Sequence, residues 1–320
     1  MRIPLVIALL MLGASSSFAQ EPDLLRHFDY DQKAPLRIKW IGMQRRSSAT
    51  IYDITYDSPK GGVVPAYLVV PKGRGPFAAV IWGHWYWENS SMRNRREFLD
   101  EAIALAPAGV ISLLIDGPIA RPGHVESKEP LNEQDISDLV QAAVDFRRGV
   151  DLLVARRDVD PKRLAYVGHS YNAVVGAILS GVEKRFKAFV LMAATMSDEV
   201  TMKTPEYQAY RQKVGPEKID AFVAKYAWTD QGKYVSHAAP AVVFLQYGSQ
   251  KKFLNAQRAV QYAAVVSEPK RFKLYDAPHS LNADARRDRI QFLIEQLRLK
   301  PLSEAQMTSI PNLYQPPEPN

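Results

Sequence analysis

The stretch from Arg163 to Asn172, Arg-Leu-Ala-Tyr-Val-Gly-His-Ser-Tyr-Asn, constrains the fold of this chain more than any other. Its apolar residues predict a short buried strand, Gly-His-Ser predicts a tight turn, and a helix is expected from about Tyr171 to Leu179. A serine on a sharp strand-to-helix turn carries its hydroxyl above the edge of the sheet. The first N–H groups of the following helix then point at any negative charge that forms beside it. The stretch predicts a nucleophilic Ser170; the alternative is an ordinary surface serine in a turn.

The first residues have the composition of a secretory signal peptide. A basic start at Arg2 is followed by an apolar run over 5–13 and by a small-residue cleavage site at Ser17-Phe-Ala19. The run is too short to cross a bilayer, although an uncleaved anchor is the alternative. We therefore expect residues 1–19 to be removed and the mature protein to be secreted or periplasmic, with no membrane contact after cleavage.

The composition excludes several kinds of site. The chain has no cysteine, so cysteine nucleophiles, zinc–thiolate sites and iron–sulfur clusters are excluded. It has 41 basic and 34 acidic residues, and loss of Arg2 leaves 40 against 34, a net charge of +6. The basic residues are scattered, with small clusters at 93–96 and 184–185, and no basic stripe is interleaved with aromatic residues. We therefore expect no nucleic-acid partner.

A hairpin followed by alternating strands and helices predicts the fold class. Apart from the strand before Ser170, strands are expected over 50–56, 63–70, 76–82, 110–115, 188–194, 241–245 and 271–275. Helices are expected over 95–106, 135–156, 171–179, 255–266 and 283–299. This order predicts an α/β fold with a mostly parallel sheet of about eight strands, helices on both faces, and Ser170 after the fifth strand.

Two segments depart from this alternation of strands and helices. Residues 195–236 are polar and helix-compatible but carry several aromatic side chains, and we expect a small helical cap in which Tyr226 and Trp228 influence substrate choice. The Pro-rich tail over 301–320 is expected to be loosely held. Residues 20–300 are expected to form one domain that includes the cap.

Three passages resemble a known family. Residues 146–153 and 160–170 are similar to the helix-to-elbow passage of α/β hydrolases of the dienelactone hydrolase and acetyl-esterase type. Residues 275–281, Tyr-Asp-Ala-Pro-His-Ser-Leu, resemble the histidine loop of these enzymes. The resemblance runs from about Thr50 to Leu299. The elbow follows G-x-S-x-G except that Asn172 stands in place of the last glycine.

The resemblance implies an α/β-hydrolase fold and assigns roles to four residues. Ser170 matches the nucleophile and His279 matches the base that takes its proton. The oxyanion hole would use the backbone N–H groups of Tyr171 and Trp85, although Gly-His here replaces the usual His-Gly, which can move the second donor by about one residue. No cofactor and no metal are implied. His279 follows the last predicted strand at the same sheet edge as Ser170; the alternative is a surface loop histidine.

Two other histidines and the aromatic loop are weaker candidates. His84 lies in the loop after the third strand and His169 lies inside the elbow. Neither forms a metal-ligand spacing with an acidic cluster. The aromatic residues of this region could line a substrate pocket or pack in the core: Trp82, Trp85, Tyr86 and Trp87.

The triad acid departs from the family pattern. Lys251 stands where the family has Asp, and a lysine cannot accept a hydrogen bond from the imidazole. Asp198, after the sixth strand, is the replacement we favour. A Ser–His dyad and a weak or non-catalytic relative are the main alternatives. The other carboxylates considered are Asp276, Glu199 and Asp116.

Two functions of different class follow. The first is a secreted serine esterase that acts on a small-molecule ester through an acyl-enzyme on Ser170. The second is a non-catalytic ligand-binding protein, which Lys251 favours. A peptidase of the prolyl oligopeptidase type is less favoured because no propeller precedes the hydrolase part. No motif selects an acyl chain length or an oligomeric state.

The acid assignment gives a first prediction. A carboxylate bonded to His279 would stabilise the imidazolium, so Asp198→Asn should lower kcat by roughly 10³- to 10⁴-fold on an activated ester with little change in KM. Lys251→Asp should raise activity or rescue Asp198→Asn. If Asp198 only caps a helix, which asparagine does equally well, kcat will stay near wild type.

Overall fold

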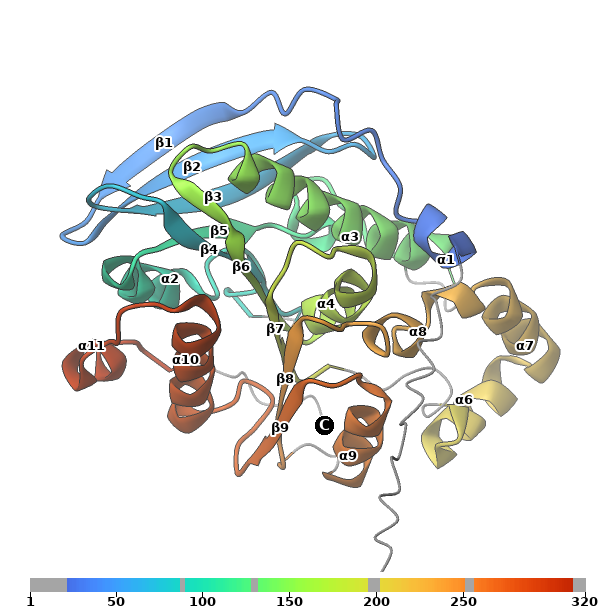
Figure 1. The fold of residues 1–320 in the computed structure, drawn as a ribbon. Coiled ribbons are helices and arrows are strands. Elements are labelled where there is room, and N and C mark those ends of the chain that lie inside the picture. The colour runs from blue at the N-terminus through green and yellow to red at the C-terminus, as the bar shows by residue number, and fades with distance from the viewer. Residues whose placement is uncertain (1–21, 87–89, 128–131, 195–201, 251–255, 313–320) are drawn as a thin grey trace, which may run out of the picture.

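One sheet forms the centre of the molecule (Figure 1). The computed structural model describes residues 22–86, 90–127, 132–194, 202–250 and 256–312. Within them the sheet has nine strands in the order β1-β2-β3-β5-β4-β6-β7-β8-β9. The strands are β1 (Lys39–Arg45), β2 (Ala49–Asp57), β3 (Val63–Pro71), β4 (Phe77–Gly83), β5 (Val110–Ile115), β6 (Val159–His169), β7 (Ala188–Met192), β8 (Val242–Gly248) and β9 (Lys270–Tyr275). Pairing is antiparallel from β1 through β3 to β5 and parallel from β5 to β9. The predicted mostly parallel sheet is confirmed.

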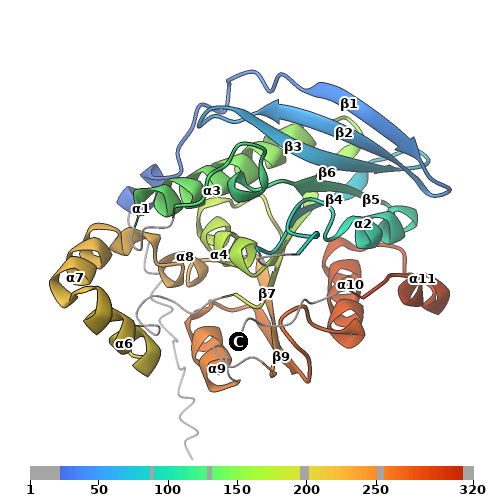
Figure 2. The ribbon, with the colours of Figure 1, turned by 180° about the vertical axis from the view of Figure 1, so that it is seen from behind.

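Helices cover both faces of this sheet (Figures 1 and 2). One face carries α3 (Glu133–Val154), α4 (Tyr171–Val182), α8 (Gly232–Val235) and α9 (Ala256–Val265). The other carries α2 (Leu99–Leu105), α10 (Ala283–Leu297) and α11 (Glu304–Thr308). Short 3-10 turns lie at Ala106–Ala108, Pro118–Ala120 and Ala227–Thr229. Each face has its own apolar core, and a long helix such as α3 becomes stable by burying its apolar stripe there.

The first strand was not predicted from the sequence. All seven residues of β1 are exposed, so the strand lacks the alternation of buried and exposed positions that marks a strand with one buried face. A register shift between Trp40 and Gly42 further disturbs its pattern. The sheet therefore has one strand more than the eight expected, this antiparallel edge strand, and the eight predicted strands follow it in the predicted order.

The described part of the 195–236 segment is helical. It contains α6 (Pro205–Val214) and α7 (Pro216–Lys225). In both ribbon views α7 is the nearer of the two to helix α1 (Pro22–Arg26), and α6 lies further away (Figures 1 and 2). The Trp228 ring stacks on His27 with 3.7 Å between centroids, and it lies 6.0 Å from Phe28. Trp228 therefore has packing partners in the N-terminal segment, which ties this insertion to the start of the chain.

The start of the tail is docked rather than loose. Helix α11 begins with a capping box between Ser303 and Gln306. The Arg286 guanidinium of α10 donates to the Pro311 carbonyl at 3.1 Å and to the Asn312 side-chain oxygen at 2.7 Å. The expectation of a loosely held tail is therefore wrong for residues 304–312.

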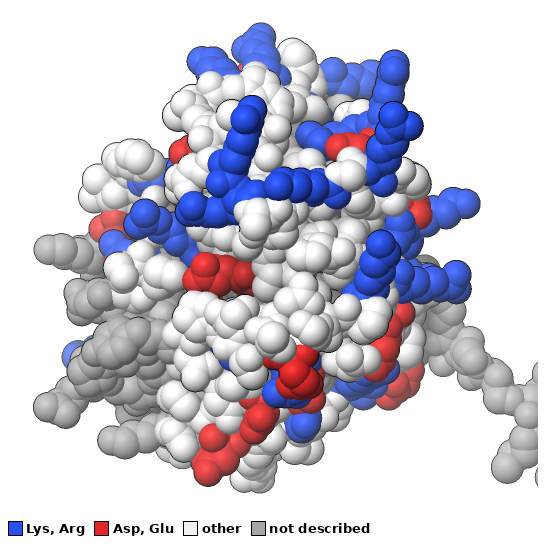
Figure 3. Space-filling view, turned by 90° about the vertical axis from the view of Figure 1, so that its left-hand side faces the viewer, with Lys and Arg blue, Asp and Glu red and all other residues white. Residues whose placement is uncertain are grey.

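Charge is unevenly distributed over one side of the molecule. Figure 3 shows the side on which β1, α2 and α11 lie in Figure 1. Lys and Arg side chains predominate in its upper half, and Asp and Glu side chains lie mostly in its lower half. On this side, basic and acidic side chains are therefore separated between the two halves of the face.

Candidate active site

Ser170 lies on a strained turn between β6 and α4. Its φ is 54° and its ψ is −113°, a conformation that residues with a side chain rarely adopt. The Ser170 N–H donates to the Met192 carbonyl of the neighbouring strand at 2.8 Å, which holds the turn against the end of β7. The structure therefore gives Ser170 the strand-to-helix geometry that the sequence predicts.

Gly168 makes this turn possible. A Cβ at position 168 would lie 2.2 Å from the carbonyl oxygen of Asn172, a backbone atom that cannot move aside. Only glycine therefore allows β6 to approach the first turn of α4 so closely. This requirement explains the first glycine of the elbow pattern.

Asn172, the departure from the pattern, has a structural role of its own. Its side chain is completely buried, and its amide nitrogen donates to the His84 carbonyl at 2.6 Å. Its own carbonyl accepts a hydrogen bond from the Tyr166 hydroxyl at 2.7 Å. Asn172 thus joins the elbow to the loop after β4, a contact that a glycine cannot make.

The histidine loop crosses the end of β8 on its way back towards the elbow. A Cβ on Gly248 would lie 2.4 Å from the Ala277 carbonyl and 2.3 Å from the Pro278 carbonyl, so glycine is needed at the crossing. The Gln250 N–H donates to the same Ala277 carbonyl at 3.1 Å. The crossing allows a loop that begins three strands away from β6 to reach the elbow.

His279 lies beside the elbow. The His169 ring, one residue before Ser170, contacts the His279 carbonyl through Nε2 at 2.9 Å, and the two rings are 5.0 Å apart between centroids. The Trp85 ring stacks on both, at 5.1 Å from His169 and 6.1 Å from His279. His279 is 2% exposed. The structure thus brings together the elbow and the histidine that the sequence predicts at one sheet edge.

Glu97 is a part of the site that the sequence analysis missed. Its Oε1 lies 2.5 Å from His169 Nδ1, and its Oε2 accepts the Trp85 N–H. Burial raises the pKa of the Glu97 carboxyl, and the neighbouring His169 opposes the rise. Because Glu97 directly follows the basic cluster at 93–96, its sequence context is that of a solvated helix face. The one signal in the sequence is Glu101, four residues later, which falls on the same side of the helix. In the structure both glutamates are buried beside the apolar stripe of α2.

The expected oxyanion donor Trp85 needs a correction. Its N–H is already donated to the buried Glu97 carboxylate, so it does not point at a substrate bound to Ser170. The Gly-His order allows the second donor to shift by about one residue, and the next residue along the chain is Tyr86. Tyr171 is the first residue of α4, where N–H groups have no partner within the helix.

His84 connects two loops instead of acting as a base. Its Nδ1–H donates to the Trp85 carbonyl at 2.7 Å, and its Nε2 accepts the Gly117 N–H at 3.0 Å. Desolvation lowers the pKa of His84 to about 4, against the smaller effect of the Trp85 carbonyl. His84 is therefore neutral at pH 7 and fixes the ends of β4 and β5 relative to each other.

The candidate acids divide into those with other partners and those outside the described residues. Asp276 accepts the Gln250 side-chain amide at 3.0 Å on the surface. Asp116 accepts the Arg95 N–H at 2.7 Å and lies 3.6 Å from the Arg95 guanidinium. Asp198, Glu199 and Lys251 lie outside the described residues.

Two of the loop aromatics belong to the core. Trp82 is 1% exposed and packs on Phe98 at 5.2 Å, and Trp85 is fully buried against the two histidines. Tyr86 is partly exposed, and its hydroxyl donates to Glu126 at 2.5 Å. Trp87 lies outside the described residues. Core packing is thus the role of Trp82 and Trp85.

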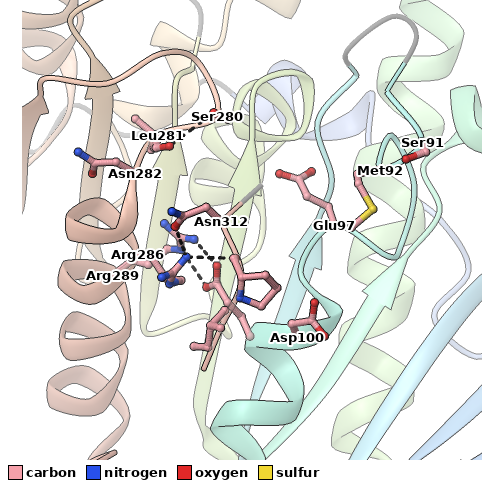
Figure 4. A pocket seen from close by; sticks show the side chains of 13 residues that line it. Ser91, Met92, Glu97, Asp100, Ser280, Leu281, Asn282, Arg286, Arg289 and Asn312 are labelled. Atoms are coloured by element: carbon pink, nitrogen blue, oxygen red, sulfur yellow. Dashed lines mark hydrogen bonds and ion pairs between the residues drawn. The ribbon is translucent and has the colours of Figure 1, made fainter. Parts of the chain in front are cut away.

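A cavity of about 290 Å³ lies between the Glu97 segment and the start of α10 (Figure 4). Ser280 and Asn282 line it from the histidine loop, and Arg286 and Arg289 line it from α10. The Arg289 guanidinium forms a buried ion pair with Glu101. The cavity therefore borders both Glu97 and the histidine loop.

Among the described residues, no three histidine and acidic side chains gather closely enough to hold a metal ion. In the same part of the chain, no helix combines the length and apolar character needed to cross a membrane.

The sheet, its helices and the serine elbow define the class: the chain has the α/β-hydrolase fold. It is similar to an acetyl xylan esterase from Paenibacillus sp. R4, with a TM-score of 0.67 and 19% identity over 87% of this chain and 96% of the other. It is also similar to acetyl xylan esterase 1 from Thermoanaerobacterium sp. JW/SL YS485, with a TM-score of 0.69 and 17% identity over 85% of this chain and 92% of the other. A cold-adapted esterase from an Arctic intertidal metagenomic library is also similar (TM-score 0.57, 14% identity, 81% and 99%). At these identities the likeness establishes the fold.

The sequence relatives match a smaller part of the chain at somewhat higher identity. No protein-family model matches the chain. It is 28% identical over 143 residues to the polyketide transferase ATR5 of Stachybotrys chlorohalonatus, covering 44% of this chain and 43% of that protein. It is 24% identical over 191 residues to the "Putative hydrolase YtaP" of Bacillus subtilis, covering 55% and 63%. The chain thus spans less than two thirds of the length of either relative.

The Asn172 contact gives a prediction about stability. Asn172→Ala leaves the buried His84 carbonyl without its donor, so the free energy of unfolding should fall by about 1–3 kcal/mol in urea titrations. Asn172→Gly, which restores the family pattern, should cost about 1 kcal/mol more because glycine is unfavourable within a helix. Asn94→Ala, whose side-chain hydrogen bonds are exposed, is the control and should change stability by less than about 0.5 kcal/mol. Equal stability of Asn172→Gly and wild type would contradict this role.

His84 predicts a pH dependence. Its pKa is about 4 in the folded protein and 6.5 in the unfolded chain, so between these values the unfolded chain binds more protons. Stability should therefore fall as the pH drops from 7 to 4, by about 3 kcal/mol from this group. Over the same range, the free energy of unfolding of His84→Gln should fall by about 3 kcal/mol less than that of wild type. Chemical denaturation at each pH measures the difference. Parallel pH curves for the two proteins would exclude a neutral, buried His84.

Proposed function

We propose that this protein is a serine hydrolase of carboxylic esters, with Ser170 as nucleophile and His279 as general base. The observation that carries the proposal is the strained Ser170 at the start of α4, next to the histidine loop. The esterases among the solved structures with this fold support the same reaction class. The substrate is expected to be a small-molecule ester, and the signal peptide predicted over 1–19 makes the protein secreted or periplasmic.

The reaction would follow acyl transfer in two halves. His279 takes the Ser170 hydroxyl proton while the oxygen attacks the ester carbonyl carbon, and the tetrahedral intermediate collapses as the C–O bond to the alcohol breaks. The imidazolium gives its proton to the leaving alcohol. Water, deprotonated by His279, then attacks the acyl-enzyme, and Ser170 leaves with the proton returned to it.

The negative oxygen of both intermediates needs donors. The Tyr171 N–H, at the positive end of the α4 dipole, is one proposed donor. Because the Trp85 N–H is bound to Glu97, we propose the Tyr86 N–H as the second. Asp198 remains the proposed triad acid, since the other candidates among the described residues, Asp116 and Asp276, have other partners.

A ligand-binding protein without turnover is the second candidate. Lys251 at the usual position of the acid favours it. Even so, loss of the acid in such triads lowers turnover by about 10⁴-fold and still leaves catalysis well above water. Lys251 alone therefore does not remove the hydrolase function.

Ester turnover tests the proposal. Wild type should hydrolyse at least one p-nitrophenyl ester in a series of rising acyl length, and Ser170→Ala and His279→Ala should each lose nearly all of that kcat because the two residues act as one unit. Ser249→Ala, an exposed serine at the end of β8, is the matched control and should keep wild-type rates. Near-native kcat in either active-site variant would show that the residue is wrongly assigned, and binding without turnover by wild type would favour the second candidate.

A further inference from the structure

A buried carboxylate and imidazole lie at the junction of three loops. Glu97, before α2, contacts the Trp85 N–H of the loop after β4 and the His169 ring of the elbow. The same ring contacts the His279 carbonyl of the loop after β9. Both side chains of the pair have no exposed surface. One Glu–His pair thus joins the three segments that surround Ser170.

The partners fix where the protons lie. The His279 carbonyl can only accept, so His169 Nε2 must carry a hydrogen. The Trp85 N–H can only donate, so Glu97 Oε2 must accept. One proton therefore remains between His169 Nδ1 and Glu97 Oε1, which are 2.5 Å apart. The pair is either imidazolium with carboxylate or imidazole with carboxylic acid, and both forms keep all three hydrogen bonds.

The pair is buried at the edge of the cavity shown in Figure 4, which Glu97 lines on one side. The charge of Arg289 also acts on Glu97, but less than His169 does, and Arg289 is itself paired with Glu101. On the other side, Trp85 covers both histidine rings. Hydrogen bonds in such a low-dielectric site are strong when complete and costly when broken.

We propose that Glu97 and His169 are positioning residues that set the histidine loop and the loop after β4 relative to Ser170. The inference rests on the proposed ester hydrolysis, in which His279 is the base and the residue after Trp85 supplies an oxyanion donor. Glu97 holds the first loop through the Trp85 backbone, and His169 holds the second through the His279 backbone. A displacement of about 1 Å in either loop is enough to lower turnover about 10²-fold.

Paired substitutions at Glu97 test this role. Glu97→Leu fills the site but removes both hydrogen bonds, and it should lower kcat about 10²-fold on a p-nitrophenyl ester with little change in KM. Glu97→Gln should stay within about tenfold of wild type, because its amide oxygen can accept the Trp85 N–H and its NH₂ can donate to His169 Nδ1. His169→Phe keeps a ring beside Trp85 without either hydrogen bond, so it should resemble Glu97→Leu. It also provides the test if Glu97→Leu does not fold.

Glu101→Gln is the matched control. It also removes a buried carboxylate, one turn further along, but that carboxylate pairs with Arg289 rather than with His169. It should lower the melting temperature and leave kcat unchanged in the folded protein. If Glu97→Leu and Glu101→Gln both keep wild-type kcat, or if Glu97→Gln loses as much kcat as Glu97→Leu, the positioning role is overturned.

A spectroscopic measurement separates this inference from the proposed function. The proton between Glu97 and His169 should give a far-downfield NH resonance in proton NMR of the wild-type protein, and Glu97→Leu should abolish it. Presence of this resonance in a protein that turns over no ester would refute the hydrolase function and leave the Glu–His contact intact. Absence of the resonance in an active wild-type enzyme would refute the contact itself.

Discussion

The close approach of backbone segments around Ser170 is the constraint on which the rest of the site depends. Gly168 lets β6 meet the first turn of α4, and Gly248 lets the histidine loop cross β8. Neither approach would hold without polar partners for the buried backbone groups. Asn172 supplies one for the His84 carbonyl, and His169 supplies one for the His279 carbonyl. The site is therefore assembled from loops whose positions are set by buried hydrogen bonds beneath the catalytic atoms.

These hydrogen bonds also explain why this elbow tolerates its unusual sequence. A second glycine after Ser170 would leave the His84 carbonyl without a donor, since His84 itself uses its ring on Trp85 and Gly117. Asparagine at position 172 and histidine at position 84 thus act together to hold the loop after β4. The Gly-His order of that loop and the Asn of the elbow are parts of one arrangement.

The sequence was sufficient to predict the elements that have a clear hydrophobic pattern. The elbow, the parallel strands and the meeting of His279 with the elbow follow from buried strands that end at one edge of a sheet. The edge strand β1 was not predictable, because all of its side chains face solvent. The role of Glu97 was not predictable either, because it follows three arginines in four residues, a pattern that indicates a solvent-exposed helix face. The partner of the Trp85 N–H depends on that same glutamate, so the oxyanion assignment could not be made from the sequence.

Covalent labelling tests the central claim, that Ser170 is an activated nucleophile, most directly. Wild-type protein treated with a fluorophosphonate should gain the mass of one phosphonyl group, and peptide mapping should place that group on Ser170. The Ser170→Ala variant should gain none. Absence of an adduct on wild type at any pH, or an adduct on another residue, would contradict the account.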